Sequence, residues 1–427
     1  MRHGELLKEL EDGTLLPRLE PVYGADAPNA AGRLLDLTRE YAGTFPCGED
    51  TDVCLFSAPG RTEIGGNHTD HQHGHCLAAA VEMDTIACAA PNGSNIIRIK
   101  SQHHRMAEVD LDHLDINGDE TGSSPALVRG VAARLTQMGY TIGGFDAYTT
   151  TRVLRGSGLS SSAAFEVLVC TIMNHLFCGD RLTPIQAAQV GQYAENVYYG
   201  KPCGLLDQLS CASGGVIAAG FGDPADPTVS QVQVDLAARG YALCIVDAGA
   251  SHSSLIDDYA SIPQEMGQVA AYFGKEVLGD VPYEDFRQAL PAIRDVCGDR
   301  AVLRAFHFFQ DDQRVAQQLE ALERDDFDTF LHLVRQSGRS SFMYLQNVAT
   351  YRDSRVQPMA VLLSQAEELL GDRGACRIHG GGFAGTIQAF VPLDLLEPFT
   401  RRMETLTREG ACYALNIRST GAACLIA

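Results

Sequence analysis

The sequence has no excess of positive charge. It carries 33 Lys and Arg residues against 54 Asp and Glu residues, which gives a formal net charge of −21 over 427 residues. The average surface would repel a nucleic-acid backbone or an anionic membrane, so we expect neither as a partner. Small substrates are not excluded, because a local basic site can coexist with an acidic surface.

Paired cysteines and long apolar runs are missing as well. The 13 cysteines include no CxxC pair and are odd in number, which argues against a disulfide framework and a structural zinc site. The residues after Met1 are charged, unlike a signal peptide, and we find no run of the roughly 18–20 apolar residues that a bilayer span needs. We therefore expect a soluble, cytoplasmic protein with reduced thiols.

The length and the residue patterns predict a mixed fold in two lobes, because 427 residues exceed the usual size of one compact core. Strand-like and helical segments alternate in the first half, where we expect helices at about 161–177 and 184–199. A strand is expected at 241–247, and 254–372 is mostly helical in pattern. The chain ends in a strand, a helix and a strand. We predict an α+β fold with one lobe over residues 1–220 and a second over residues 221–427.

A glycine- and serine-rich stretch, "RGSGLSSSAAFEV" at 155–167, follows a predicted strand and opens a predicted helix. Its serines and first helical amides would offer donors at the positive end of the helix dipole, which suits a phosphate group. The stretch lacks the GxxxxGK[ST] pattern and the glycine spacing of a dinucleotide site. Alone, it predicts either a phosphate loop or an ordinary serine-rich helix cap.

Three further stretches carry candidate chemistry. In "APGRTEIGGNHTDHQHG" at 58–74, the string "HTDH" fits either a transition-metal cluster or a grip on a polyhydroxylated molecule. In "CRIHGGGFAGTIQAFV" at 376–391, a triple glycine predicts either a tight hairpin turn or a backbone approach to a phosphate or a neighbouring loop. Asp207 lies in the apolar setting "GLLDQL", where an unpaired carboxylate would be costly to bury. It therefore needs a cationic partner or a chemical task.

These stretches, in this order, resemble the GHMP small-molecule kinases and, within them, the galactokinases. "APGRTEIGGNHTDHQHG" is similar to the sugar signature, "GSGLSSSAA" to the phosphate loop, "AENVYYGKPCGLLDQ" to the segment with the catalytic aspartate, and "HGGGFAG" to the carboxy-terminal glycine motif. The resemblance extends from about residue 50 to the end. It implies a two-lobed GHMP fold with the active site between the lobes, ATP and Mg²⁺ as cosubstrate and cofactor, and phosphorylation of the anomeric hydroxyl of a sugar.

The resemblance also implies a role for individual residues. Asp207 corresponds to the catalytic aspartate with Arg61 as its partner, and Ser162 and Glu195 correspond to magnesium ligands. The positions expected to contact the sugar are Asn67, His68, Asp70, Gly204 and Tyr259. Those expected around the nucleotide are Gly156, Ser157, Gly158, Leu159, Ser160, Ser161 and Ser162, with Gly380, Gly381 and Gly382 as the glycine motif.

Elementary chemistry agrees with these roles. Phosphoryl transfer needs positioning and charge neutralisation more than covalent help. Asp207 can accept the departing proton or orient the hydroxyl, and the permanently charged Arg61 would keep that carboxylate ionised. A carboxylate and a hydroxyl, as in Glu195 and Ser162, suit Mg²⁺. Asp70 and His68 can bind sugar hydroxyls, which favours the sugar over a transition metal. His71, His73 and His75 receive no role.

The chain departs from the galactokinase pattern at Asn67, where "GEHTD" usually places a glutamate that contacts the 6-hydroxyl of the sugar. An amide can still bond a hydroxyl, so galactose remains the first expected substrate. The following "DHQ" is similar to galacturonokinases and arabinokinases, which leaves a related sugar 1-kinase as the alternative. A non-catalytic sugar- and ATP-binding regulator is disfavoured by retention of Arg61, Ser162, Glu195 and Asp207. A metal hydrolase would require tight metal binding by His68 and Asp70.

Overall fold

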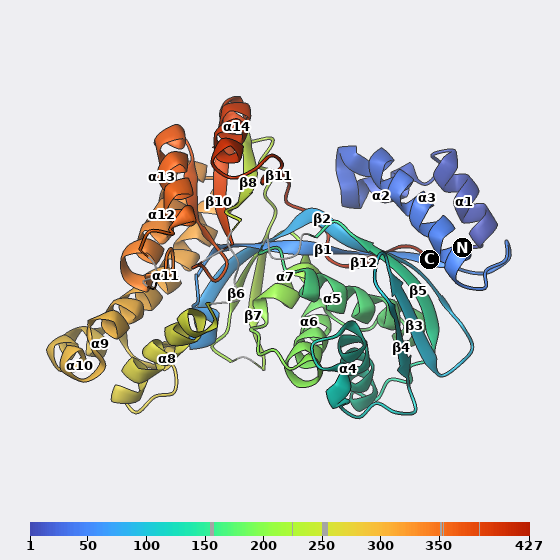
Figure 1. Ribbon diagram of the computed structural model, residues 1–427, viewed down its shortest axis with the longest axis horizontal. Coiled ribbons are helices and arrows are strands. Elements are labelled where there is room, and N and C mark those ends of the chain that lie inside the picture. Colours follow the sequence, from blue (N-terminus) through green and yellow to red (C-terminus); the bar gives the residue numbers. More distant parts are fainter. Residues whose placement is uncertain (154–157, 224, 250–254, 351, 353, 384) are drawn as a thin grey trace.

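The protein folds around two β-sheets, and the α+β class predicted from the sequence is confirmed (Figure 1). A computed structural model describes residues 1–153, 158–223, 225–249, 255–350, 352, 354–383 and 385–427. The strands of the larger sheet are β1 (Cys54–Gly65), β2 (His75–Pro91), β3 (Ile96–Ser101), β4 (Met106–Asp110), β5 (Phe145–Thr151), β6 (Val216–Gly220), β7 (Thr228–Val232) and β12 (Ala423–Ile426). Those of the smaller sheet are β8 (Tyr241–Asp247), β9 (Ala375–His379), β10 (Thr386–Pro392) and β11 (Cys412–Leu415).

Helices cover both sheets. The amino-terminal helices are α1 (His3–Glu11), α2 (Leu16–Tyr23) and α3 (Ala27–Thr44), followed by α4 (Ser124–Gln137), α5 (Ser161–Met173), α6 (Pro184–Tyr193) and α7 (Leu206–Ser213). The later helices are α8 (Ile256–Tyr272), α9 (Tyr283–Gln288), α10 (Leu290–Cys297), α11 (Asp299–Glu323), α12 (Phe327–Ser340), α13 (Pro358–Leu370) and α14 (Leu396–Leu406). In Figure 1, α4–α7 lie on one side of the long strands β1 and β2, and α1–α3 lie on the other.

Strand pairing extends the larger sheet beyond the expected lobe boundary at residue 220. β7 pairs with β6, and β12, at the end of the chain, pairs with β1. The smaller sheet has the order β11-β8-β10-β9, all antiparallel. A continuous apolar cluster joins the larger sheet to the smaller sheet and its helices. It contains Ile64 and Leu77 of the larger sheet together with Val315 of α11, Phe330 of α12 and Phe390 of β10. This shared core fixes β1 against the helices that follow residue 255.

One helical segment corrects an expectation. We expected no apolar stretch long enough for a membrane, yet α5 and the π-helical turn that continues it form such a segment by length and composition over Ser161–Cys178. More than half of it, 56%, is buried inside the protein. Val167, Leu168 and Ile172 are fully buried in the apolar core beside β1 and α4. Burial of this kind is typical of a core helix, which passes the same compositional test.

Candidate active site

Arg61 and Asp207 form a two-point ion pair at the centre of the molecule. Arg61 lies on β1 and Asp207 lies in the first turn of α7. Arg61 Nε donates to Asp207 Oδ1 at 2.7 Å, and its Nη2 lies 2.6 Å from Oδ2. Burial disfavours the charge on Asp207, but Arg61 and a hydrogen bond from Ser160 Oγ more than compensate, so the pKa of Asp207 lies below its usual value. The expected carboxylate and its cationic partner are thus brought together, with the carboxylate ionised at neutral pH.

The described part of the predicted phosphate loop lies against this pair, whereas Gly156 and Ser157 lie outside the described residues. Gly158 accepts a hydrogen bond from Arg61 Nη1 through its carbonyl. A Cβ atom at this glycine, whose φ is +73°, would lie 2.8 Å from His379 Nδ1. A glycine is therefore required both by the backbone conformation and by the close approach of β9.

The next residues lead into α5. Leu159 is fully buried in the apolar core, and its carbonyl accepts a hydrogen bond from the Arg61 backbone amide at 3.1 Å. Ser160 adopts a left-handed conformation with φ 53° immediately before the helix and directs its hydroxyl to Asp207. Ser161 begins α5. The free backbone amides of this helix end are the groups that could bind an anion.

Ser162 and Glu195 also lie together, as expected for a shared cation. Ser162 Oγ donates to Glu195 Oε1 at 3.2 Å, and the carboxylate is almost completely buried. Lys201 Nζ lies 3.1 Å from the same oxygen, and Gln208 Nε2 donates to Oε2 at 2.9 Å. This set of hard oxygen atoms fits Mg²⁺. No group of three or more His, Cys, Asp or Glu side chains is placed to hold a metal within the described part of the chain.

Sequence reasoning missed a second buried carboxylate beside Glu195. Glu166 of α5 is fully buried and accepts a hydrogen bond at 3.0 Å from Gln208 Nε2, which also donates to Glu195. Burial, together with the neighbouring Glu195, raises the pKa of Glu166 well above its usual value. This environment favours the neutral form of Glu166. Its position facing inward from an apolar helix, "AAFEVLV", was the available sequence signal.

The triple glycine joins β9 to β10 and binds the sugar signature through its carbonyl groups. Gly380 O accepts from Asn67 Nδ2 at 2.8 Å, and Gly381 O accepts from His68 Nε2 at 3.0 Å. The motif is therefore a hairpin connection between β9 and β10 and also a backbone approach to a neighbouring loop, two possibilities that its sequence had raised separately. In addition, Tyr259 Oη donates to Gly382 O at 2.5 Å, which brings another expected sugar contact to the same loop.

His68 is held neutral in this arrangement. Its ring is partly buried, and this desolvation lowers its pKa to about 4. A carbonyl can only accept a hydrogen bond, so the Nε2 atom that faces Gly381 O carries the proton. Nδ1 is then left as an acceptor. The residue has φ 61°, an uncommon conformation for a non-glycine residue, which the contact with the glycine loop holds in place.

Asp70 and Gly204 are brought together from separate motifs. A Cβ atom at Gly204 would lie 2.4 Å from Asp70 Oδ2, so a side chain at position 204 would displace the Asp70 carboxylate. Gly204 lies three residues before Asp207, and Asp70 begins a short 3₁₀ turn after the sugar signature strand. Asp70 is thus placed next to the chain segment that leads into α7 and Asp207.

Asn67 is the exception among the expected sugar contacts, because its amide is fully used within the protein. The side chain is completely buried. Its two amide hydrogens are directed to Gly380 O and to Glu63 Oε1, the latter at 2.9 Å. Its Oδ1 accepts from Asn347 Nδ2 at 2.7 Å and from Ser341 Oγ at 3.4 Å. The amide therefore ties β1 to the helical region, and sequence reasoning identified neither Glu63 nor Asn347.

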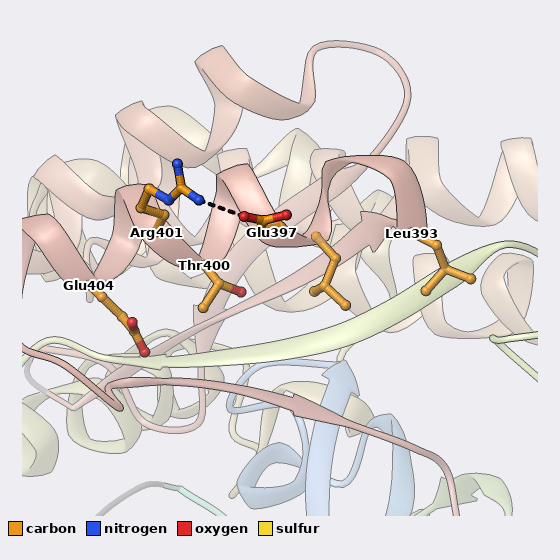
Figure 2. A pocket seen from close by; sticks show the side chains of 6 residues that line it. Leu393, Glu397, Thr400, Arg401 and Glu404 are labelled. Carbon is orange, nitrogen blue, oxygen red and sulfur yellow. Dashed lines mark hydrogen bonds and ion pairs between the residues drawn. The ribbon is translucent and has the colours of Figure 1, made fainter.

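Of the remaining histidines of "HTDHQHGH", His71 borders this cluster, and its ring centroid lies 6.4 Å from that of His68. His75 Nδ1 lies 2.9 Å from Asp312 Oδ1, and the His71 side chain is about half exposed, 3.9 Å from Asp70 Oδ1. A surface hollow elsewhere, shown in Figure 2, is lined by Leu393, Leu396, Glu397, Thr400, Arg401 and Glu404. Its lining comes only from α14 and the turn before it, so it shares no residue with the candidate active site.

Comparison with known proteins agrees with this geometry. The galactokinase galactose-binding signature matches residues 40–91, and the GHMP kinase amino-terminal domain matches residues 126–215. The chain is 31% identical over 376 residues to the galactokinase of Streptomyces coelicolor, covering 88% of this chain and 92% of that protein.

Solved structures show the same fold. Lactococcus lactis galactokinase complexed with galactose superposes with a TM-score of 0.78 at 24% identity, covering 92% of this chain and 99% of that one. The mevalonate kinase of Methanococcus jannaschii gives a TM-score of 0.59 at 12% identity, covering 86% of this chain and 98% of that one. The sequence identity to the Streptomyces enzyme and the two family signatures, together with the paired Arg61 and Asp207, show that the chain belongs to the galactokinase family of GHMP kinases.

Proposed function

We propose that the protein is an ATP-dependent sugar 1-kinase that converts galactose and ATP into galactose 1-phosphate and ADP. The observation that carries this proposal is the ion pair between Arg61 and Asp207, which lies between the beginning of α5 and the sugar signature. Galactose is the substrate class recognised by the family whose signature matches residues 40–91. A non-catalytic regulator would not need to retain the pair of Arg61 and Asp207 together with the pair of Ser162 and Glu195.

In the proposed reaction, the anomeric oxygen of the sugar forms a bond to the γ-phosphorus as the bond to the bridging oxygen of ADP breaks. Asp207 is ionised and accepts a hydrogen bond from the attacking hydroxyl, whose proton passes to this carboxylate or to solvent. Arg61 holds the carboxylate through two contacts and places positive charge beside the transferred group. The low pKa of Asp207 favours an orienting role over strong proton abstraction.

Ser162 and Glu195 are the residues that would hold Mg²⁺, with Lys201 as an additional cation beside Glu195. The metal ion, when bound, would neutralise charge on the ATP phosphates. Glu166 and Gln208 would hold the Glu195 carboxylate in position. Gln208 donates to both carboxyl groups, and a neutral Glu166 adds no second negative charge beside Glu195. The amides at the beginning of α5 would bind the phosphates.

The neutral His68 and the carboxylate of Asp70 would bind sugar hydroxyls, His68 through the acceptor Nδ1. We propose that the active site lies between two lobes whose division follows the sheets. The first lobe would then extend beyond residue 220 to include β7 and would recover β12 from the end of the chain. A cytoplasmic location remains a prediction from the unpaired cysteines.

A sugar panel tests the proposed function. The purified protein is incubated with MgATP and galactose, galacturonate, arabinose or 6-deoxygalactose, and ADP release is measured together with the position of the new phosphate. We expect the highest kcat/KM for galactose and phosphate on the anomeric oxygen. A higher kcat/KM for galacturonate or arabinose would instead assign the related sugar 1-kinase. Binding of galactose and ATP without ADP release would identify a regulator and overturn the proposal.

A further inference from the structure

Glu63 is a buried carboxylate beside the candidate active site to which no role has been assigned. It lies on β1, two residues after Arg61, and the strand pairs regularly with β2 between these positions. Alternate residues of a strand point to the same face, so Glu63 and Arg61 project together, roughly 7 Å apart along the strand. Its side chain is 12% exposed and is therefore not completely enclosed by the protein.

One oxygen of this carboxylate is fixed by the protein and the other is free. Glu63 Oε1 accepts from Asn67 Nδ2 and from Arg377 Nη2, both at 2.9 Å. Arg377 is completely buried on β9 and therefore sets the position of the carboxylate rigidly. Glu63 Oε2 accepts no hydrogen bond from the residues that the structure describes. A carboxylate with one satisfied and one free oxygen is prepared to accept a hydrogen bond from a ligand.

The charges around Glu63 place it with the candidate active site rather than in the core behind it. Burial raises the pKa of Glu63, and the nearby Asp70 acts in the same direction. The guanidinium groups of Arg377 and Arg61 act in the opposite direction, and the resulting pKa is about 7. Glu63 therefore senses both the cation of the catalytic pair and the carboxylate expected to bind the sugar. Along the chain it lies between Arg61 and Asp70.

Asn67 cannot fill the same role, because every strong donor and acceptor of its buried amide is bonded to Glu63, Gly380, Asn347 or Ser341. The galactokinase pattern has its glutamate at position 67, and here that position holds an amide that donates to a glutamate four residues earlier. The carboxylate is thus kept in the cluster but is presented from β1 instead of from the loop that follows this strand.

We propose that Glu63, and not Asn67, determines sugar specificity by accepting a hydrogen bond from the 6-hydroxyl of the substrate and by repelling sugars with a carboxylate at C6. This inference rests on the proposed sugar 1-kinase function. In this arrangement the anomeric hydroxyl lies at Asp207 and Arg61, and Glu63 lies two strand residues away from Arg61. Glu63 therefore faces a sugar hydroxyl that is remote from C1. A neutral hydroxyl gains a charge-assisted bond there, whereas a uronate places like charges together.

The test compares Glu63→Gln with the parent protein through the ratio of kcat/KM for galactose to that for galacturonate. We expect this ratio to fall by roughly 10–100-fold, since like-charge contacts cost several kcal/mol and are removed by the amide. Activity with 6-deoxygalactose, which lacks the hydroxyl, should change by less than activity with galactose. Glu108→Gln removes a carboxylate from the exposed position on β4 and is expected to leave the ratio unchanged.

Two further variants keep the proposal falsifiable. Glu63→Gln leaves Arg377 without its counter-ion, so Glu63→Gln/Arg377→Met removes both charges together if the single variant does not fold. Asn347→Ala removes a hydrogen bond to Asn67 and leaves Glu63 unchanged. If Glu63 had a purely structural role, Asn347→Ala would change the ratio as much as Glu63→Gln does. An unchanged ratio in both Glu63 variants, or an equal change in Asn347→Ala, overturns the proposal. If the parent protein phosphorylates no sugar, the proposed function itself fails.

Discussion

The substitution Asp207→Asn separates the charge of the candidate active site from its shape. The side chains are nearly the same size, but the amide nitrogen cannot accept from Arg61, and the negative charge is lost. In the parent protein both oxygens of Asp207 contact Arg61, at 2.7 and 2.6 Å, and the Arg61 side chain is only 10% exposed. The variant therefore leaves a nearly buried guanidinium without its counter-ion.

The Asp207→Asn variant should lose both catalytic rate and folding stability. A positioned group that accepts or orients the reacting proton contributes roughly 10²–10⁴ in rate, which corresponds to about 3–5 kcal/mol of barrier. Breaking a buried ion pair costs about 3–5 kcal/mol in stability, and we expect the lower part of this range or less because the Asp207 side chain is 31% exposed. Turnover should thus fall by orders of magnitude while the fold persists.

The assay measures kcat with saturating sugar and MgATP, galactose binding by calorimetry, and thermal unfolding across pH. The folded-state pKa of Asp207 lies below its unfolded value, so its ionised form stabilises the fold above about pH 4 and this contribution disappears as the pH falls through the folded pKa. Asp207→Asn should lose this acid-limb dependence. Ser160→Ala serves as the control, since it removes one hydrogen bond to Asp207 and keeps the ion pair. Turnover within threefold of the parent in folded Asp207→Asn would refute the reasoning.

Two other predictions concern the metal ligands and the sugar side. Ser162→Ala and Glu195→Gln should each raise the Mg²⁺ concentration needed both for activity and for metal-dependent nucleotide binding, because each removes or weakens a hard oxygen ligand; unchanged titrations in both variants would remove the metal assignment. Gly204→Ala should raise the KM for galactose more than that for ATP, because its Cβ would lie 2.4 Å from Asp70 Oδ2. Gly118→Ala, with open space around the added atom, is the matched control, and equal effects of the two on galactose KM would contradict this prediction.

The local patterns of the sequence predicted much of the fold. The strand expected at 241–247 is β8, and the helices expected at about 161–177 and 184–199 correspond to α5 and α6 with their π-helical continuations. The amino-terminal helices α1 and α2 were missed, since their residues were considered only as the charged start of the chain. β7 was missed too, because its burial is low and its apolar pattern is weak.

The sequence likewise predicted only some of the residues of the candidate active site. Resemblance to a family identified Arg61 and Asp207, and their contact across 146 residues of sequence follows that expectation. It could not identify the partners of Asn67, because Asn347 lies 280 residues away and no local periodicity records which side chain meets which across two sheets. The pair of Glu63 and Arg377, separated by 314 residues, was hidden for the same reason.

The glycine motif explains how these distant partners are held in register. A Cβ atom at Gly381 would lie 2.6 Å from the ring of Tyr259, and one at Gly382 would lie 2.2 Å from Asn347 O. Side chains at these positions would therefore push the loop away from the residues whose hydrogen bonds it accepts. Asn67 and His68 donate to the loop's carbonyl groups, so a displaced loop would release the sugar signature as well. The requirement for glycine at positions 381 and 382 therefore follows from the closeness of the chain segments that meet at this loop.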